Sequence, residues 1–168
     1  MSRWRPPRAK STPYITAQGF DALKVEQSEL WRRRRDVVKA LSAAAAEGDR
    51  SENAEYIYRK KELAGIDRRI RYLQKRLPEL KVVRESPADD KIYFGAWVRL
   101  ARDDETEVEY RIVGPDEIDQ QDEYISLDSP VARALLKKSV DDEVTVQIGG
   151  NEQTLLVLSI RYMPQSDS

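Results

Sequence analysis

Residues 47–56 read EGDRSENAEY and lie between two long segments that are rich in charged, helix-forming residues. Gly48 is a good end for the first helix, and Asp49 or Ser51 can cap the second. Glu52, three residues after Asp49, would complete a variant of the capping box. The stretch therefore predicts a turn that folds one helix back on the other.

The segments on either side of this turn carry an apolar seam. We expect the first helix over about residues 17–47, capped by Thr16, and the second from about residue 51 to just before Pro78. Apolar residues recur in both at alternating spacings of three and four, which is the coiled-coil pattern. An antiparallel hairpin requires facing residues whose numbers have a constant sum, here 100: Leu23 with Leu77, Leu30 with Ile70, Val37 with Leu63, and Ala44 with Tyr56.

The residues after the hairpin change to the period of β-strands. The strand-like segments are residues 92–100, 107–113, 124–127, 143–148 and 154–162, with a Gly149-Gly150-Asn151 turn before the last. One helix is expected in LDSPVARALLKK, with Ser129 as its N-cap and Pro130 at its first position. The predicted fold class is α+β: an N-terminal antiparallel helical hairpin followed by a small antiparallel sheet with one helix.

Composition excludes several classes of chemistry. The 168 residues contain no cysteine and no histidine, which rules out disulfides, thiolate or histidine catalysis and Cys-ligated zinc. Only carboxylates remain as metal ligands, and these favour hard ions such as magnesium or manganese. No apolar run is long enough for a membrane span, and MSRWRPPRAK lacks the apolar core of a signal peptide. We expect a cytoplasmic protein.

Charge is distributed unevenly along the chain. Residues 1–80 carry 19 Lys and Arg against 11 Asp and Glu, whereas residues 81–168 carry 10 against 19. This split suggests two different partners, with the basic half facing a polyanion. The alternative is a solvated helical surface followed by an acidic domain, and the split alone favours the nucleic-acid partner only slightly. We divide the chain into a basic flexible tail (residues 1–13), a hairpin arm (residues 14–80) and a C-terminal domain (residues 81–168).

Two interpretations of the tip stay open. Asp49 and Glu52 can serve only as turn and cap residues. They can also form an exposed carboxylate pair, which binds magnesium weakly alone but could complete a metal site inside another active centre. The two roles do not exclude each other.

A run of arginines on the first helix is the next candidate site. Arg32 to Arg35 lie opposite residues 65–68 in the hairpin register, beside Arg68 and Arg69. Asp36 and Asp67 are too few to neutralise this cluster, and Trp31 and Tyr72 offer stacking surfaces. Contact with single-stranded RNA is one interpretation, and a solvated basic face is the other.

These motifs together resemble those of the Gre transcript cleavage factors of bacterial RNA polymerase. The resemblance covers about residues 13–162. Arg50 and the larger basic cluster make the chain most similar to the GreB branch of that family. The segments that carry the resemblance are GDRSENAEY, RRIRYLQKRL, FGAWV, YRIVGPDEI, YISLDSPVARALLKK and DEVTV.

The resemblance implies a function. An FKBP-like C-terminal domain would dock on RNA polymerase at the rim of its secondary channel, and the hairpin would pass down that channel to the nascent RNA 3′ segment of a backtracked complex. The polymerase itself would hydrolyse the RNA, using a Mg²⁺ that it shares with the tip and that the isolated, monomeric protein does not bind tightly. The implied site residues are Asp49 and Glu52 for the metal, Arg50, Ser51 and Asn53 as tip support, Arg32, Arg33, Arg35, Arg68 and Arg69 for RNA, and Asp128, Ser129 and Pro130 for docking.

Other functions stay open at this point. A channel-binding regulator could act on polymerase without cleavage, and a coiled-coil adaptor would use the seam between chains. An FKBP-like fold also suggests a prolyl isomerase, although fold does not imply function. The tyrosines and Trp97 of the strand region do not suggest an aromatic-lined pocket.

Overall fold

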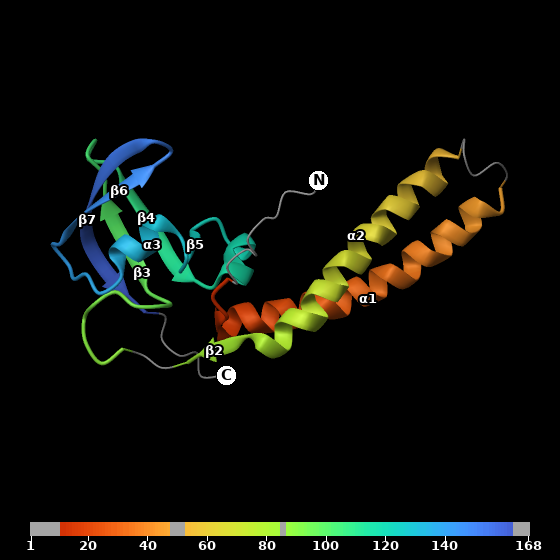
Figure 1. The fold of residues 1–168 in the computed structure, drawn as a ribbon, viewed down its shortest axis with the longest axis horizontal. Helices are drawn as coiled ribbons and strands as arrows, with labels where there is room; N and C mark the ends of the chain where they lie inside the picture. The colour runs from red at the N-terminus through yellow and green to blue at the C-terminus, as the bar shows by residue number, and fades with distance from the viewer. Residues whose placement is uncertain (1–10, 48–52, 85–86, 163–168) are drawn as a thin grey trace, which may run out of the picture. The chain divides into compact units, whose positions relative to one another are not determined.

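The computed structural model describes residues 11–47, 53–84 and 87–162. They form two compact units (Figure 1). The hairpin unit is residues 20–80, and the C-terminal unit combines residues 11–19 with the chain from residue 81 onward. The sequence-based division placed residues 14–19 in the arm, whereas the structure groups them with the C-terminal unit.

Two antiparallel helices build the hairpin unit (Figure 1). Helix α1 spans Ala17–Ala45, helix α2 spans Ala54–Arg76, and a 3₁₀ turn, η1, follows at Leu77–Glu79. Thr16 caps α1 as predicted, because its Oγ1 accepts a hydrogen bond of 3.0 Å from the backbone N–H of Gly19. With 29 residues, α1 is about 44 Å long at 1.5 Å per residue.

The apolar seam of the hairpin is confirmed at its centre. Val37, Ile66 and Ile70 are buried in one cluster, against which Leu30 and Leu63 pack. The cluster contains both central pairs of the predicted register. Three further seam residues are buried farther along the helices, namely Leu23, Ala44 and Leu73.

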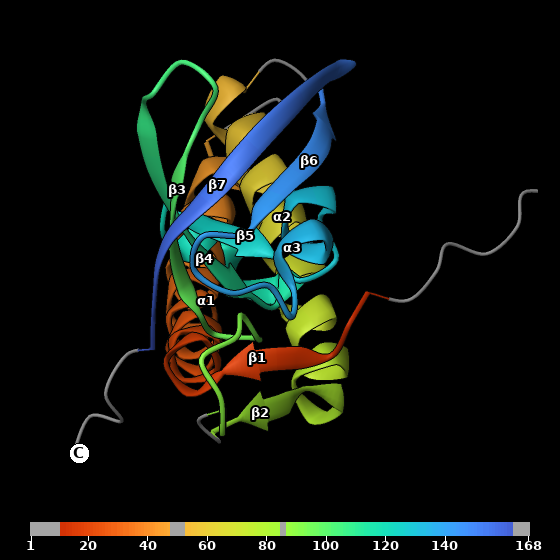
Figure 2. The same cartoon turned by 90° about the vertical axis from the view of Figure 1, so that its left-hand side faces the viewer.

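A five-stranded sheet in the order β5-β4-β3-β7-β6 dominates the C-terminal unit (Figure 2). The strands are β3 (Trp97–Ala101), β4 (Glu107–Val113), β5 (Tyr124–Ser126), β6 (Glu143–Ile148) and β7 (Asn151–Arg161). The α+β class is confirmed, but the expectation of a wholly antiparallel sheet is wrong at one edge. There β5 runs parallel to β4, since the 3₁₀ helix η2 (Pro115–Gln120) carries the chain over between them.

Turn residues set the strand limits. The first long strand was expected from residue 92 but begins at Trp97, because Gly95 has a φ of 87° and turns the chain there. Gly149 and Gly150, with φ of 58° and 83°, form the tight turn between β6 and β7, as predicted. Asn151 lies in β7 rather than in the turn.

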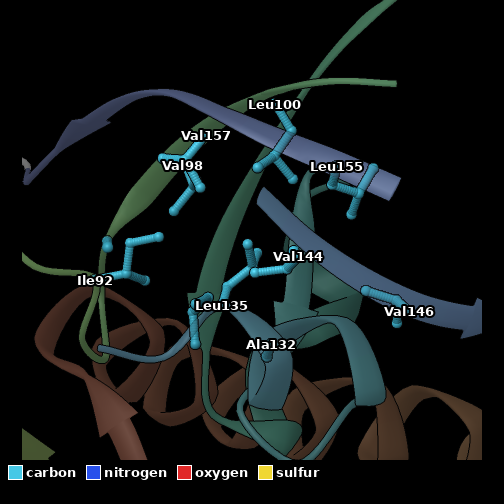
Figure 3. Packing of buried hydrophobic residues seen from close by; sticks show 11 residues of the cluster. Ile92, Val98, Leu100, Ala132, Leu135, Val144, Val146, Leu155 and Val157 are labelled. Carbon is cyan, nitrogen blue, oxygen red and sulfur yellow. The ribbon is translucent and has the colours of Figure 1, made fainter. Parts of the chain in front are cut away.

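The core of the C-terminal unit lies between this sheet and the helix α3 (Pro130–Leu135) (Figure 3). Ala132 and Leu135 of α3 are fully buried against the inward side chains of four strands. Those inward side chains include Val98, Leu100, Ile112, Val144, Val146, Leu155 and Val157. Their alternation along each strand is the period-2 pattern on which the prediction rested.

A second sheet, of two strands, pairs the segment before the hairpin with the segment after it. Strand β1 (Tyr14–Thr16) pairs in parallel with β2 (Lys81–Val83). The pairing extends to Pro13, whose carbonyl accepts a 2.8 Å hydrogen bond from the N–H of Lys81. This ladder explains why residues 14–19 pack with the C-terminal unit.

Candidate functional site

The hairpin tip is described only up to its two flanks. The candidate residues Asp49, Arg50, Ser51 and Glu52 lie outside the described residues. The last helical residue before them is Ala45, and the first after them is Ala54. The second helix was expected near residue 51, with Asp49 or Ser51 as its cap; the cap in the structure is Asn53.

Asn53 joins the two helices at the tip. Its side-chain Oδ1 accepts a 3.1 Å hydrogen bond from the N–H of Tyr56, which satisfies one of the free donors in the first turn of α2. Its Nδ2 donates a 2.8 Å hydrogen bond to the carbonyl of Ala44 in the last turn of α1. One side chain thus ties together the helix ends on either side of residues 48–52.

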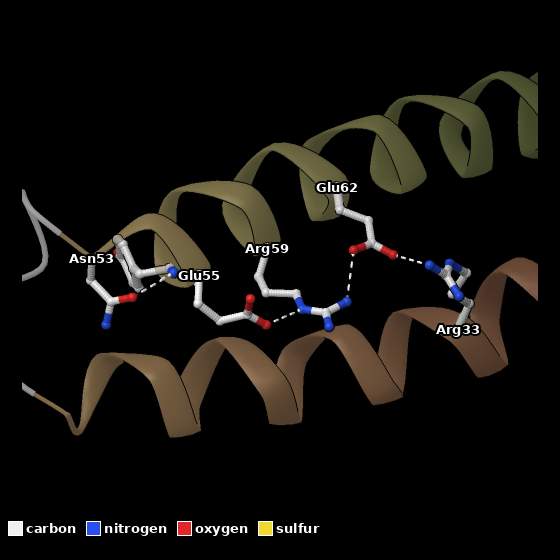
Figure 4. Close-up of polar contacts among 6 residues, drawn as sticks. Arg33, Asn53, Glu55, Arg59 and Glu62 are labelled. Carbon is white, nitrogen blue, oxygen red and sulfur yellow. Dashed lines mark hydrogen bonds and ion pairs between the residues drawn. The ribbon is translucent and has the colours of Figure 1, made fainter.

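A chain of ion pairs runs from this end of α2 toward the arginine cluster (Figure 4). Arg59 donates to Glu55 at 2.8 Å and to Glu62 at 3.0 Å. The hydrogen bonds to Glu55 and then to Glu62 raise the pKa of the Arg59 guanidinium. Glu62 also accepts from Arg33 of α1, so it bridges the two helices.

The structure separates the arginine cluster into paired and unpaired side chains. Ion pairs across the hairpin engage three members: Arg33 with Glu62, Arg34 with Asp67 and Arg69 with Glu26. Within the described part of the chain, Arg32, Arg35 and Arg68 are exposed and form no ion pair. Only Asp36 and Asp67 were expected to neutralise the cluster, so the ion pairs with Glu26 and Glu62 were not predicted.

Two aromatic side chains flank the cluster as expected. Trp31 is 42% exposed and Tyr72 is 43% exposed, so each keeps part of its ring available for stacking. The guanidinium of Arg69 lies 5.4 Å from the Tyr72 ring centre. That contact, with the two hydrogen bonds of 2.7 and 2.9 Å to Glu26, fixes the orientation of Arg69.

The candidate docking residues lie where the chain enters α3. Ser129 caps the helix by accepting from the N–H of Ala132 at 3.2 Å, and Pro130 occupies the first helical position with its side chain exposed. Both features were predicted as helix-start chemistry. The carboxylate of Asp128 instead binds Thr12, accepting a 3.0 Å hydrogen bond from its N–H and contacting its hydroxyl.

Comparison with known proteins gives the family. The model described as "Transcription elongation factor, N-terminal" matches residues 13–82, and the model described as "Transcription elongation factor, GreA/GreB, C-term" matches residues 87–162. A curated relative from Xanthomonas axonopodis pv. citri, "Transcription elongation factor GreB", is 57% identical over 165 residues, which cover 96% of this chain and 98% of the relative. This chain belongs to the GreA/GreB family.

A second curated relative agrees with this membership in the Gre family. A "Transcription elongation factor GreB" of Pseudomonas aeruginosa is 55% identical over 166 residues, covering 98% of this chain and 99% of the relative. A solved structure of the transcription factor Gfh1 matches with a TM-score of 0.44 and 22% identity, covering 91% of this chain and 99% of that one. The resemblance drawn from the sequence motifs is confirmed.

One buried acid of this Gre-family chain was not among the predicted site residues. Glu117 of η2 is fully buried, and its Oε2 accepts hydrogen bonds from the N–H groups of Thr16 at 2.8 Å and Gly114 at 2.9 Å. Its other oxygen accepts from the Thr16 hydroxyl at 2.5 Å. Glu117 therefore holds the residue that caps α1, over a sequence separation that no local pattern reveals.

Close backbone approaches surround this acid. A Cβ at Gly114 would lie 1.8 Å from the carbonyl oxygen of Tyr14, and a Cβ at Gly19 would lie 2.2 Å from a carboxylate oxygen of Glu117. Both positions therefore require glycine for space rather than for backbone conformation. The sequence of residues 114–117, Gly-Pro-Asp-Glu, offered a signal for this turn, since a glycine ahead of a proline and an acid often begins a capped turn.

Acidic side chains of the described residues do not gather into a metal centre. Among residues 11–47, 53–84 and 87–162, no group of three or more acids could hold a metal ion. The expected ligands, Asp49 and Glu52, lie outside these ranges. Their carboxylate chemistry fits Mg²⁺, but two such ligands leave most of its coordination to water or to a partner.

Of the helices in the described ranges, none combines the length and apolar character needed to cross a bilayer.

Proposed function

We propose that this protein binds RNA polymerase in its secondary channel and stimulates the polymerase to cleave backtracked nascent RNA. Membership of the GreA/GreB family supports the role in transcription elongation. The structural observation that carries the proposal is the tie made by Asn53 between the last turn of α1 and the first turn of α2. This tie anchors the chain on both sides of residues 48–52. The narrow helical hairpin can then present these residues inside a partner protein.

The dimensions of the hairpin suit this role. Helix α2 alone, with 23 residues, extends about 34 Å. Its seam is filled within one chain, by residues of α1 and α2 that pack on each other. This intramolecular packing supports a monomeric probe over an adaptor that would pair its seam with another chain.

At the tip, Asp49 and Glu52 would hold a Mg²⁺ together with ligands of the polymerase active centre. When bound there, the ion would supply charge neutralisation and an activated water for phosphodiester hydrolysis. The contribution of this chain is two carboxylates and their placement, with Arg50, Ser51 and Asn53 supporting the turn. On this proposal the isolated protein is not a nuclease.

The arginine cluster would contact the RNA 3′ segment. Arg32, Arg35 and Arg68 are the members best suited to phosphates, because they are exposed and form no ion pair among the described residues. To bind phosphate, Arg33 would have to release Glu62 or share it with the phosphate. Arg69 would have to do the same with Glu26. The C-terminal unit would dock on the channel rim through the α3 start, where Pro130 is exposed.

The decisive test is Asp49→Asn in a cleavage assay on stalled, backtracked elongation complexes. Asparagine keeps a capping oxygen and the shape of aspartate but removes its charge, so a purely structural role predicts little change. We expect loss of most stimulated cleavage with unchanged polymerase binding, and partial recovery at raised Mg²⁺ or with Mn²⁺. Asp21→Asn is the matched control, because Asp21 is exposed on the same arm and pairs only with Lys24 within the described residues.

Glu52→Gln extends the test. It should behave like Asp49→Asn, and the double variant should be little worse than either single one, since the two ligands act as a unit. Full cleavage activity in both single variants would refute the metal role. If the wild-type chain binds polymerase but stimulates no cleavage, the protein is a channel-binding regulator instead.

A further inference from the structure

One contact in the C-terminal unit bears on how the docking motif works. The two carboxylate oxygens of Asp128 both engage Thr12: Oδ2 accepts a 3.0 Å hydrogen bond from its N–H, and Oδ1 accepts from its hydroxyl. The contact spans 116 residues of sequence and is partly buried. Asp128 is itself oriented by its own N–H, which donates to the Ser126 hydroxyl at 3.0 Å.

The segment that Asp128 holds is also fixed on its other side. The Pro13 carbonyl accepts from the N–H of Lys81 at 2.8 Å, and β1 then continues along β2. Residues 12 and 13 are therefore bound on both sides to the C-terminal unit. This arrangement places them directly beside the start of α3, since Ser129, the next residue after Asp128, is the helix cap.

We propose that Asp128 acts in docking through Thr12: its carboxylate pins residues 11–13 next to Pro130, and this segment forms part of the docking surface. The inference rests on the proposed polymerase binding and assigns Asp128 a positioning role within it. Charged hydrogen bonds are among the stronger ones, so this pair can hold the segment against thermal motion. Pro130, whose side chain is exposed, remains available for direct contact.

Charge indicates the chemistry of the partner surface. The chain ahead of residue 11 carries Arg3, Arg5, Arg8 and Lys10 and no acid, whereas residues 81–168 carry 10 basic and 19 acidic side chains. Arg133 of α3 is exposed and adds positive charge next to the start of that helix. The surface fits an acidic patch of polymerase, and long-range attraction of this kind raises association rates.

The test is a double-mutant cycle on full-length protein, with the affinity for core polymerase as the readout. Thr12→Val removes the hydroxyl donor, and Asp128→Ala removes both acceptors. We expect each change to weaken binding on the order of tenfold, the loss of one or two charged hydrogen bonds. The double variant should bind no more weakly than Asp128→Ala, because both changes break the same contact.

Two controls separate this role from general damage. Thr12→Ser keeps the hydroxyl and should bind like wild type. Thr106→Val breaks an equivalent contact of a threonine hydroxyl with an aspartate, Asp104, in a loop of the same unit, and should not change binding. Replacing Arg3, Arg5 and Arg8 together by Gln should weaken binding and flatten its dependence on salt.

The outcomes of this experiment separate a failure of the inference from a failure of the proposed function. Wild-type affinity in Thr12→Val, with weak binding in Asp128→Ala, overturns the inference and returns Asp128 to direct contact with the partner. Additive losses in the double variant overturn it as well. If the wild-type chain itself does not bind core polymerase, it is the proposed function that fails.

Discussion

Changing Asn53 to Asp separates the two bonds that its side chain makes at the tip. Aspartate retains the oxygen that accepts from the Tyr56 N–H, and it caps helices about as well as asparagine. It lacks the Nδ2 donor that bonds the carbonyl of Ala44. The substitution therefore removes the tie between α1 and α2 while it keeps the cap on α2.

The two roles of Asn53 predict changes of opposite sign in the free energy of unfolding of Asn53→Asp. If only the cap matters, Asn53→Asp should be neutral or stabilise the protein by up to about 0.5 kcal/mol, since a negative charge favours a helix N-terminus. If the tie matters, the loss of a partly buried hydrogen bond should outweigh that gain and cost about 1 kcal/mol. Asn53→Ala removes both bonds and should cost about 2 kcal/mol.

Amide hydrogen exchange at the tip flanks is the most direct assay. The Ala44 carbonyl also accepts from the Glu47 N–H at 3.3 Å, so losing the tie should loosen this last turn. A loss of 1 kcal/mol corresponds to roughly fivefold faster exchange at Glu47. Exchange at Ile57, whose N–H bonds the Asn53 carbonyl, should change little in Asn53→Asp and rise in Asn53→Ala.

Stimulated cleavage should fall in parallel with the exchange result, because looser flanks place the tip carboxylates less accurately. Gln18→Glu is the control for the added charge, since it makes the same amide-to-acid change at an exposed position in the first turn of a helix, α1. Unchanged exchange at Glu47 together with wild-type cleavage in Asn53→Asp would refute the tie and leave Asn53 as a simple cap.

Three further predictions concern other contacts. Glu62→Gln should free Arg33 and raise crosslinking to RNA a few-fold, because Glu62 is its acidic partner, whereas Arg59 keeps its ion pair with Glu55. Gly114→Ala should lower the free energy of unfolding by about 3 kcal/mol, as its Cβ would meet a backbone carbonyl 1.8 Å away. Tyr162→Phe should cost about 1–2 kcal/mol at neutral pH, because the phenol accepts from the Tyr93 N–H and donates to a backbone carbonyl. Burial raises the pKa of Tyr162 above its ordinary value of 10.0, so the unfolded chain loses this proton first and stability falls as the pH rises past that value. The Phe variant should lack this part of the alkaline decline in unfolding scans.

Each of these three predictions can be contradicted by a specific result. Equal RNA crosslinking in Glu62→Gln would show that Arg33 does not reach the RNA. Gly65→Ala is the control for Gly114, because its Cβ would come no closer than 3.7 Å to Arg68 and alanine favours a helix interior by up to about 1 kcal/mol. Equal stability of the two glycine variants would refute the close-approach argument. An alkaline decline unchanged in Tyr162→Phe would assign it to other groups.

The hairpin could be predicted from the sequence because its signals are local and periodic. A repeat of threes and fours on both arms, with a single turn signal between them, leaves one register that buries Val37 and Ile70 together. The cap on α2 was assigned to the wrong residue because Asp49, Ser51 and Asn53 all have capping side chains. Only the fold decides which of them meets a free N–H.

The parts that could not be predicted depend on long-range contacts. The parallel pairing of β5 with β4 and the β1–β2 ladder join segments whose order in the sheet no local pattern encodes. Glu117 looks like any surface acid in the sequence, yet it is fully buried under the cap of α1. The contact of Thr12 with Asp128 is equally hidden, and the motif alone suggested a free docking residue.

Cross-helix pairing also changes what the arginine cluster can do. Of the five arginines expected to contact RNA, Arg33 and Arg69 already have acidic partners on the opposite helix. Exposed pairs of this kind contribute little to stability, so phosphate can displace the acids without unfolding the hairpin. Each displaced acid nevertheless stays nearby and repels the incoming phosphate. RNA affinity should therefore depend mainly on Arg32, Arg35 and Arg68, and neutralising these three should flatten the salt dependence of crosslinking more than neutralising the paired two.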